Sequence, residues 1–216
     1  MTGLIIMINQ KREDILSYFN EILPDAKCEL NYFNDYSLLI AVCLSAQTTD
    51  NSVNKVTPIL FDKYRSLDEL ANAKLEDVEE CIKSIGLYHN KAKNIISLAQ
   101  ELISRFNKKV PNNKQDLLSL PGVGNKTANV VLCELFSQNE FPVDTHVERV
   151  SKRLKLAKKL DNVKVVESNL RKYFPEDKYI LLHHQFIHFG RYFCTSRNPK
   201  CENCKLKKYC SFKNQK

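Results

Sequence analysis

The sequence has no long apolar run, and nothing at its start resembles a secretion signal. Its longest apolar stretch, SLLIAVCLSA, is well short of the ~18 residues that a membrane-spanning helix needs. The apolar LIIMI near the N-terminus has no basic residues before it, unlike a signal peptide. We therefore expect a cytoplasmic protein that has no membrane partner.

Alternating apolar and polar residues bounded by turn signals, the pattern of half-buried strands, are also missing. Apolar residues instead recur at helical spacing, as in Val53, Val56, Ile59 and Leu60 and again along residues 92–106. Ser66-Leu67-Asp68-Glu69 has the order of a helix capping box. No such start signal marks the first ten residues, which we expect to be loosely ordered. The sequence predicts an all-α protein.

The four cysteines near the C-terminus lie within 17 residues, with the spacing Cys194-x6-Cys201-x2-Cys204-x5-Cys210. Such a short loop cannot bury a core of its own, so metal-ligand bonds must supply much of the free energy that orders it. Zinc sites usually pair their ligands as two Cys-x2-Cys knuckles, and only one such pair is present. The spacing favours an iron-sulfur cluster and leaves zinc as the alternative.

A disulfide framework is a weaker interpretation of the eight cysteines. The chain has 216 residues, of which 43% are hydrophobic, so it can build a core without covalent staples. The absence of a secretion signal also argues against an oxidising compartment.

The basic excess is concentrated around the cysteine loop. The formal net charge is +8, and from Arg191 to Lys216 the chain has eight basic residues and one acidic residue, Glu202. A basic region held on an ordered loop is the footprint expected for a polyanion such as nucleic acid. The alternative is a solvated basic tail that binds nothing.

Two of the five glycines stand together in Pro121-Gly122-Val123-Gly124, between the helical pattern DLLSL and the apolar helix NKTANVVLCELF. Glycine lets backbone N–H groups approach a ligand closely, and the second helix directs its positive end the same way. This turn is therefore a candidate site for a DNA phosphate, a contact that reads no base sequence. A plain corner between two helices is the alternative.

Lys126 falls in the first turn of that second helix, where the helix dipole repels a cation. Repulsion and partial desolvation would both lower the pKa of the amine and free its lone pair for attack on carbon. An exposed lysine that touches phosphate is the alternative role.

Asp144 stands where the next helix, VERVSKRLKLA, should begin, and it is expected to cap that helix. A carboxylate held by backbone N–H groups stays ionised and can stabilise positive charge that develops on a sugar. Of the histidines, His183, His184 and His188 lie on an apolar helix and are expected in the core or at an interface, whereas His146 is expected to line a cleft.

These motifs together resemble the endonuclease III family of base-excision DNA glycosylases with lyase activity. The resemblance rests on LPGVGNKTANVVL, VDTHVERV and the cysteine spacing, and it extends through LSAQTTDNSVNK (44–55) and SIGLYHNKAKNI (84–95). It implies two helical lobes: a six-helix lobe with a helix-hairpin-helix over residues 28–137, and an iron-sulfur lobe formed by 1–27 plus 138–216. It also implies a monomer that is associated with the nucleoid.

The resemblance further assigns roles to residues. Lys126 would attack C1′ of the damaged nucleoside, and Asp144 would assist departure of the base. One 4Fe-4S cluster would be bound by Cys194, Cys201, Cys204 and Cys210, as a structural group. Gln47 and Leu87 would fill the space that a flipped base leaves in double-stranded DNA containing damaged pyrimidines or abasic sites. The residues expected to contact DNA are Gln47, Leu87, Gly122, Val123, Gly124, Thr127, His146 and Arg191.

Two other functions stay open at this point. Mismatch glycosylases that remove adenine or thymine share the hairpin and the cysteines but lack a lysine at the position of Lys126, so the lysine favours the bifunctional enzyme. A non-catalytic DNA-binding protein with an iron-sulfur scaffold is the third interpretation.

Overall fold

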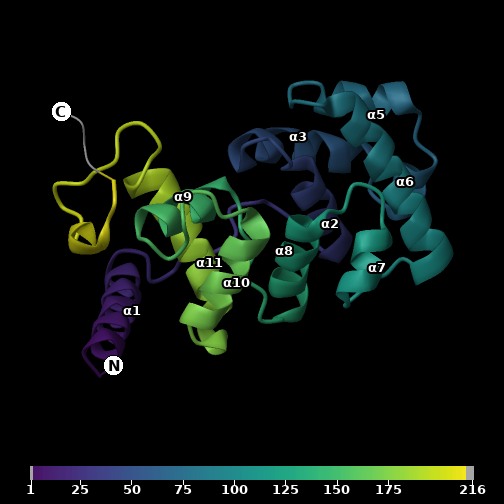
Figure 1. Cartoon of the computed structure of the whole chain (residues 1–216). Coiled ribbons are helices and arrows are strands. Elements are labelled where there is room, and N and C mark those ends of the chain that lie inside the picture. Colours follow the sequence, from purple (N-terminus) through teal and green to yellow (C-terminus); the bar gives the residue numbers. More distant parts are fainter. Residues whose placement is uncertain (1, 213–216) are drawn as a thin grey trace. The chain divides into compact units, whose positions relative to one another are not determined.

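The computed structural model describes residues 2–212, with only the backbone for residues 2–6, and in this part of the chain every regular element is helical (Figure 1). No helix in it is both long and apolar enough to cross a membrane. The chain divides into two compact units, one comprising Met1–Cys28 with Asn139–Lys216 and the other Glu29–Gln138. Each of the two boundaries between the units lies one residue later in the chain than the sequence led us to expect.

Unit 2, residues 29–138, contains seven helices where the resemblance implied six. They are α2 (Asp35–Leu44), α3 (Asp50–Lys63), α4 (Leu67–Ala71), α5 (Leu75–Ile82), α6 (Tyr88–Phe106), α7 (Lys114–Ser119) and α8 (Asn125–Phe136). The shortest of them is the five-residue α4, which packs on α6. Its predicted capping box is half formed: Ser66 accepts from Glu69 N, but the Glu69 carboxylate accepts from Arg65 N instead of Ser66 N. In the apolar stripe of α3, Val53, Val56 and Leu60 are buried, whereas Ile59 is 56% exposed.

The core of unit 2 lies around α2 and α6. All residues of α2 from Ser37 to Leu44 are buried, so this helix is enclosed on every side. The longest helix, α6, buries one stripe that includes Ile95, Leu98 and Leu102. Each fully buried aliphatic side chain contributes on the order of 1.5–3 kcal/mol. These buried helices form a well-packed core, and the turns that connect the helices of unit 2 lie outside it.

Unit 1 joins the two ends of the chain. It contains α1 (Thr2–Ile22), α9 (Thr145–Arg153), α10 (Val163–Tyr173) and α11 (Tyr179–His188), which continues as a π-helical turn over Phe189–Phe193. Short 3-10 turns cover Glu176–Lys178 and Lys207–Tyr209. Because α1 begins at Thr2, the expectation of loose order in the first ten residues is wrong over residues 2–10; Met1 lies outside the described residues.

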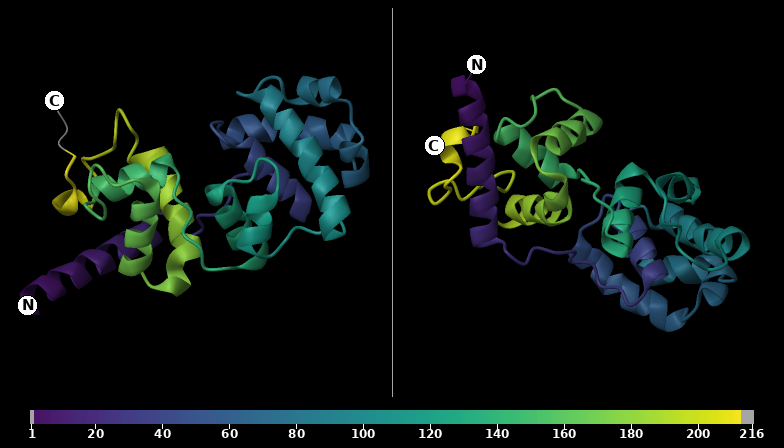
Figure 2. Two further views of the ribbon diagram at one scale, coloured as in Figure 1. Left: turned by 45° about the vertical axis from the view of Figure 1, so that its right-hand side comes forward. Right: turned by 90° about the horizontal axis from the view of Figure 1, so that it is seen from below.

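An aromatic core holds α1 against the C-terminal part of unit 1. Phe19 is fully buried, with its ring centroid 5.1 Å from that of Phe186 and 5.0 Å from that of Phe189. The N-terminal half of α1 is also tied down, since Tyr173 Oη donates to Ile8 O at 3.1 Å. Both views in Figure 2 show α1 beside the C-terminal loop that carries the four cysteines. Contacts so distant in sequence explain why the order of this helix was missed.

Candidate active site and iron-sulfur site

The turn between α7 and α8 requires glycine at one position. Gly122 has φ of +76°, the left-handed region that side chains rarely adopt, and an added Cβ would lie 3.0 Å from Asn94 Cβ. Gly124 differs, because its φ of −94° suits any residue and an added Cβ would meet nothing within 4 Å. Gly122 therefore shapes the turn, while Gly124 keeps the space beside it open.

The start of α8 has no side-chain cap. Its N-cap is Gly124, and the first helical hydrogen bond runs from Ala128 N to Gly124 O at 2.9 Å. The preceding N–H groups of the first turn have no intrahelical acceptor, which is the usual setting for an anion. Val123 and Thr127, expected to contact DNA, each have only 7% of their surface exposed. Contacts from these two residues would have to come mainly from the backbone.

Lys126 is the second residue of α8, as predicted, and its side chain is exposed. The partial desolvation expected from the sequence is therefore not supplied by unit 2, which leaves this side chain exposed. The positive end of α8 is the part of the predicted environment that the unit supplies on its own.

Gln47 and Leu87 share an unusual backbone conformation. Their φ angles are +54° and +60°, in the left-handed region, although neither residue is glycine. Both side chains are exposed, Leu87 by 55%. A bulky residue with positive φ is strained and tends to mark a functional site. The structure therefore presents both predicted DNA-inserting side chains on strained turns of the same unit.

Lys91 is a neighbour of these turns that the sequence analysis missed. Only 6% of its surface is exposed, and its ammonium donates to Thr48 Oγ1 at 2.6 Å, next to Gln47. Its backbone N donates to Leu87 O at 3.0 Å. Burial lowers the pKa of Lys91. Its place on the buried stripe of α6, four residues before Ile95, was the available signal.

Asp144 caps α9 in unit 1, as predicted. Its Oδ1 accepts from the backbone N of His146 and of Val147, both at 2.8 Å. The side chain is half-buried, so one carboxylate edge is fixed by the helix end.

His146 lies in the same half-buried environment. Arg149 Nη2 is 3.2 Å from His146 Nδ1, and burial is the main cause that lowers the pKa of His146, with Asp144 opposing it and Arg191 reinforcing it. Gly190 is required beside it, because an added Cβ would lie 2.8 Å from His146 Cβ. Asp144, His146 and Arg191 are thus close enough to influence one another. The buried His183 and His184 fit the expected core role.

The four terminal cysteines surround a common space. Each is half-buried, and all four line a cavity of about 710 Å³ in unit 1. No disulfide joins any of the eight cysteines, all of which lie in the described part of the chain, so the disulfide interpretation fails. Among the described residues, no three His, Cys, Asp or Glu side chains converge closely enough for a single metal ion. Four thiols around a cavity of this size fit a larger group such as an iron-sulfur cluster.

Burial raises the pKa of the Cys194 and Cys204 thiols. A bound metal reverses this preference, because a coordinating thiol is deprotonated. In the loop 194–210, Leu206 is the one fully buried apolar side chain. The loop therefore has little packing of its own, as the sequence predicted.

Arg153, the last residue of α9, anchors both ends of this loop and was also missed from the sequence. Its guanidinium donates to Cys194 O and Sγ, each at 3.2 Å, and to the carbonyls of Thr195 and Ser196 at 2.7 and 2.9 Å. Its own carbonyl accepts from Ser211 N at 2.7 Å. A basic residue in the last turn of a helix was the only local signal.

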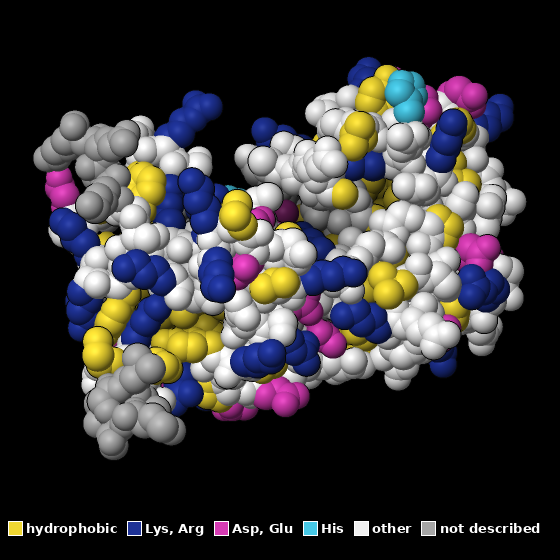
Figure 3. Space-filling model, viewed as in Figure 1, with side chains coloured by type: hydrophobic (Ala, Val, Ile, Leu, Met, Phe, Trp, Pro, Cys, Tyr) yellow, Lys and Arg dark blue, Asp and Glu magenta, His cyan; other side chains and the backbone are white. Residues whose placement is uncertain are grey.

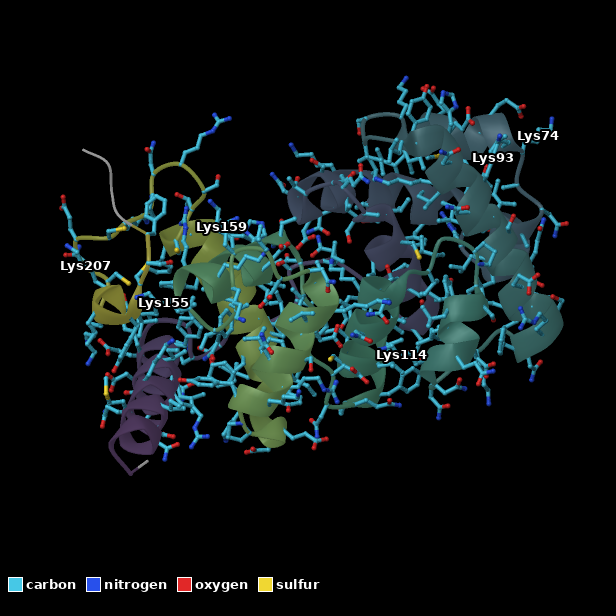
Figure 4. All side chains as sticks on the ribbon, in the orientation of Figure 1. Lys74, Lys93, Lys114, Lys155, Lys159 and Lys207 are labelled. Carbon is cyan, nitrogen blue, oxygen red and sulfur yellow. The ribbon has the colours of Figure 1, made fainter. Side chains whose placement is uncertain are left out.

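The lysines of the loop are not equivalent. Lys205 pairs with Glu21 and Lys208 with Asp14 of α1, each at 2.6 Å. Lys207 is exposed, and no ion pair forms at its side chain within the described part of the chain. Of these three, Lys207 is the lysine available to a polyanion; Figure 4 labels it on the cysteine loop.

Comparison with known proteins agrees with this geometry. Residues 40–176 match the model of the HhH-GPD superfamily base excision DNA repair protein, and residues 194–210 match the iron-sulfur binding domain of endonuclease III. The second match begins at Cys194 and ends at Cys210. Endonuclease III of Bacillus subtilis (strain 168) is 44% identical over 205 residues, covering 94% of each chain.

The chain belongs to the endonuclease III family. Endonuclease III of Rickettsia prowazekii (strain Madrid E) is 46% identical over 198 residues, covering 92% of this chain and 93% of the relative. The structure of a trapped endonuclease III–DNA covalent intermediate superposes with a TM-score of 0.89 at 47% identity, covering 93% of this chain and 95% of that chain. A thermostable thymine-DNA glycosylase superposes with a TM-score of 0.83 at 28% identity.

The family assignment settles the class of the protein. It is a base-excision DNA repair enzyme of the glycosylase and abasic-site lyase kind, and it carries one 4Fe-4S cluster.

Proposed function

We propose that this chain removes oxidised pyrimidines from double-stranded DNA and then nicks the strand at the abasic site. The observation that carries this proposal is Lys126, an exposed amine in the first turn of α8, beside an N-terminus that no side chain caps. Its relatives include a structure described as a trapped covalent intermediate with DNA, which supports covalent chemistry.

In this proposal the neutral amine of Lys126 attacks C1′ of the damaged nucleoside. A bond forms between Nζ and C1′, the glycosidic bond breaks, and the base leaves with its electron pair and takes up a proton. Loss of a proton from nitrogen and opening of the sugar give a Schiff base. Removal of a C2′ proton then expels the 3′ phosphate by β-elimination, and water releases Lys126.

Asp144 assists departure of the base. With Oδ1 held by two backbone N–H groups, the carboxylate stays in place and stabilises the positive charge that develops on the sugar. His146 and Arg191, which lie near Asp144 in unit 1, contact the DNA there.

The turn before α8 binds the DNA backbone, and two side chains insert into the duplex. Backbone N–H groups between Gly122 and Thr127 bind a phosphate without reading sequence, while that of Val123 donates to Leu120 O at 3.2 Å. Gln47 and Leu87 enter the duplex from their strained turns. Unstacking a base step costs a few kcal/mol, which the inserted apolar side chain offsets.

Cys194, Cys201, Cys204 and Cys210 bind the cluster through their thiolates. When bound, it orders the loop and thereby presents its basic side chains to DNA; it takes no part in bond breaking. The protein works as a monomer in the cytoplasm, associated with the nucleoid, where its DNA substrate lies.

The family assignment argues against the two other candidates left open by the sequence, a monofunctional mismatch glycosylase and a non-catalytic DNA-binding module, although a thymine-DNA glycosylase of known structure is also similar. These candidates differ in what the Lys126 amine does.

Borohydride trapping on a duplex containing thymine glycol separates these candidates. The wild-type chain should form a covalent protein–DNA adduct and nick the strand, whereas Lys126→Ala should do neither and still bind. Base removal without an adduct would establish the monofunctional enzyme. Binding without base removal would establish the non-catalytic module.

A further inference from the structure

Unit 1 contains a second hollow, of about 1070 Å³, which adjoins the cysteine cavity and shares Arg153 and Phe212 with it. It is bounded by the end of α9, the turns that follow it, one face of α10, and Ser211 with Phe212. Its lining includes one acidic residue, Asp161, and six basic ones: Lys152, Arg153, Lys155, Lys158, Lys159 and Lys172. We call it the basic hollow. A surface with this charge excess attracts an anion.

Two of the six cations are already engaged. Lys152 pairs with Glu148 at 2.6 Å, and Arg153 is occupied by the carbonyls of the cysteine loop. The lone carboxylate, Asp161, is used in shaping the turn, since it accepts from Lys158 N at 2.8 Å. With the charge of Asp161 included, the lining side chains still carry a net formal charge of +5.

The remaining four lysines are exposed, and none makes an ion pair within residues 2–212. They are Lys155, Lys158, Lys159 and Lys172. Figure 4 labels Lys155 and Lys159 in the turns that follow α9. In Figure 3 dark blue Lys and Arg side chains are scattered over this part of the surface and interrupted by yellow apolar ones. Four unpaired cations around one hollow suit a ligand with several negative charges.

Flat aromatic rings form part of the same hollow. Phe212 lies over the Arg153 guanidinium, 4.0 Å from Cζ to the ring centroid, and Tyr173 is held by its bond to Ile8 O. Leu156 and Ala157 complete an apolar floor. An inorganic anion gains nothing from such an apolar floor, and an acidic peptide without aromatic residues brings no ring to stack on Tyr173 or Phe212. Proteins that bind single-stranded nucleic acid combine these two features: lysines pair with the phosphates, and aromatic rings stack on the bases.

We propose that the basic hollow binds a short single-stranded segment of nucleic acid. Its phosphates pair with Lys155, Lys158, Lys159 and Lys172, and a base stacks on Tyr173. This site uses neither Lys126 nor Asp144, so it extends beyond the proposed function and can fail independently of it. It gives the enzyme a second contact, with an unpaired strand, besides the damaged duplex.

The test uses the cluster-loaded protein and a fluorescent oligothymidylate of ~10 nucleotides, within the usual site size of such proteins. Lys155→Glu with Lys159→Glu should weaken binding at least tenfold and flatten its salt dependence by about one unit or more, since each phosphate contact contributes ~0.7 on a single strand. The matched control is Lys74→Glu with Lys93→Glu, two exposed lysines of unit 2, which should change affinity less than twofold.

Two further measurements keep the result decisive. Tyr173→Leu retains apolar volume but removes the stacking face, and it should weaken binding by about tenfold. Oligoglutamate and inorganic phosphate serve as competitors and should displace the strand poorly. Equal effects of the two lysine pairs, or equal competition by oligoglutamate, would overturn the proposal. If the Glu variants lose the cluster absorbance, Lys155→Gln with Lys159→Gln replaces them, with a smaller loss of the same sign expected.

Discussion

The α7–α8 turn and the cysteine loop are both short segments proposed to touch DNA, yet different forces hold them. The turn lies between two helices. Only one of its positions requires a residue without a side chain, and that position is occupied by Gly122. The loop 194–210 buries little apolar surface and depends on four thiols around a cavity and on hydrogen bonds from Arg153. A packed frame maintains the first segment, whereas ligand bonds must maintain the second.

This difference predicts which treatments damage which segment. Changes at the metal ligands should disorder part of unit 1 and spare unit 2. Changes in the α7–α8 turn should act locally on stability or on DNA affinity, depending on which glycine is altered.

The largest effect is expected from Cys201→Ser. Loss of one thiolate removes cluster binding, and the free energy of ligand bonds that orders the loop, several kcal/mol for a structural metal site, is lost with it. Hydrogen exchange should become fast in residues 194–210 while the helices of unit 2 keep their protection. Cys133→Ser, at a buried cysteine of unit 2, is the control and should leave the loop protected. Fast exchange in α2 or α6 of Cys201→Ser would contradict independent support of the two segments.

The two glycines of the turn should separate stability from binding. Gly122→Ala forces a left-handed alanine against Asn94, so it should destabilise the protein by about 1–2 kcal/mol. Gly124→Ala meets no atom in the structure, so stability should change little, but the methyl group enters the space proposed for a phosphate. Thermal unfolding should therefore show the larger loss for Gly122→Ala, and measurements of DNA affinity should show the larger loss for Gly124→Ala. Equal loss of affinity at unchanged stability for both would refute the assignment.

Arg153→Lys tests the anchor of the cysteine loop. Lysine keeps the charge but cannot donate to Cys194, Thr195 and Ser196 together, because its ammonium lacks the planar fork of guanidinium. We expect the cluster to be lost several-fold faster on exposure to a chelator, measured by the decay of its visible absorbance. Arg149→Lys is a comparison on the same helix, and a larger effect there would shift the anchor to that residue.

Lys91→Met should uncouple stability from activity in unit 2. Methionine fills similar volume without a buried charge, so stability should be unchanged or higher. The bond that joins α6 to Thr48 is lost, so the turns bearing Gln47 and Leu87 should be less well held, and base removal should fall several-fold. Single-turnover rates and unfolding curves test this. A fall in both would assign Lys91 a purely structural role.

The smallest effect concerns pH. Burial lowers the pKa of His146 below its ordinary 6.5, so the unfolded chain takes up this proton before the folded one does. The contribution to stability is complete above pH 6.5 and declines as the pH falls below it, toward the folded-state pKa. His146→Gln should flatten this part of the stability curve. An unchanged slope would show that other groups produce it.

Local signals in the sequence identified much of this molecule. The Asp144 cap, the start of α8 beside Gly124 and the cysteine spacing each depend on residues only a few positions apart. Lys91 and Arg153 were missed because their partners, Thr48 and Cys194, are 43 and 41 residues away. The pairing of Lys208 with Asp14 is more distant still, and it determines which lysines stay available.

Some errors also have a local origin. Ile59 belongs to the same helical repeat as Val53, Val56 and Leu60, but α3 presents it to solvent with 56% of its surface exposed. The motif that names Val123 and Thr127 does not say that both residues are buried, each with only 7% of its surface exposed. Periodicity and motifs give positions in a helix, and packing decides which atoms reach a ligand.

The central claim is that the Lys126 amine becomes bonded to deoxyribose. Borohydride-reduced adduct formed on an abasic duplex, digested and sequenced by mass spectrometry, tests it at the level of the atom. The account predicts that the reduced sugar remnant is found on the peptide containing Lys126 and on that lysine. A remnant on Lys91, on another lysine, or on the N-terminal amine would contradict it.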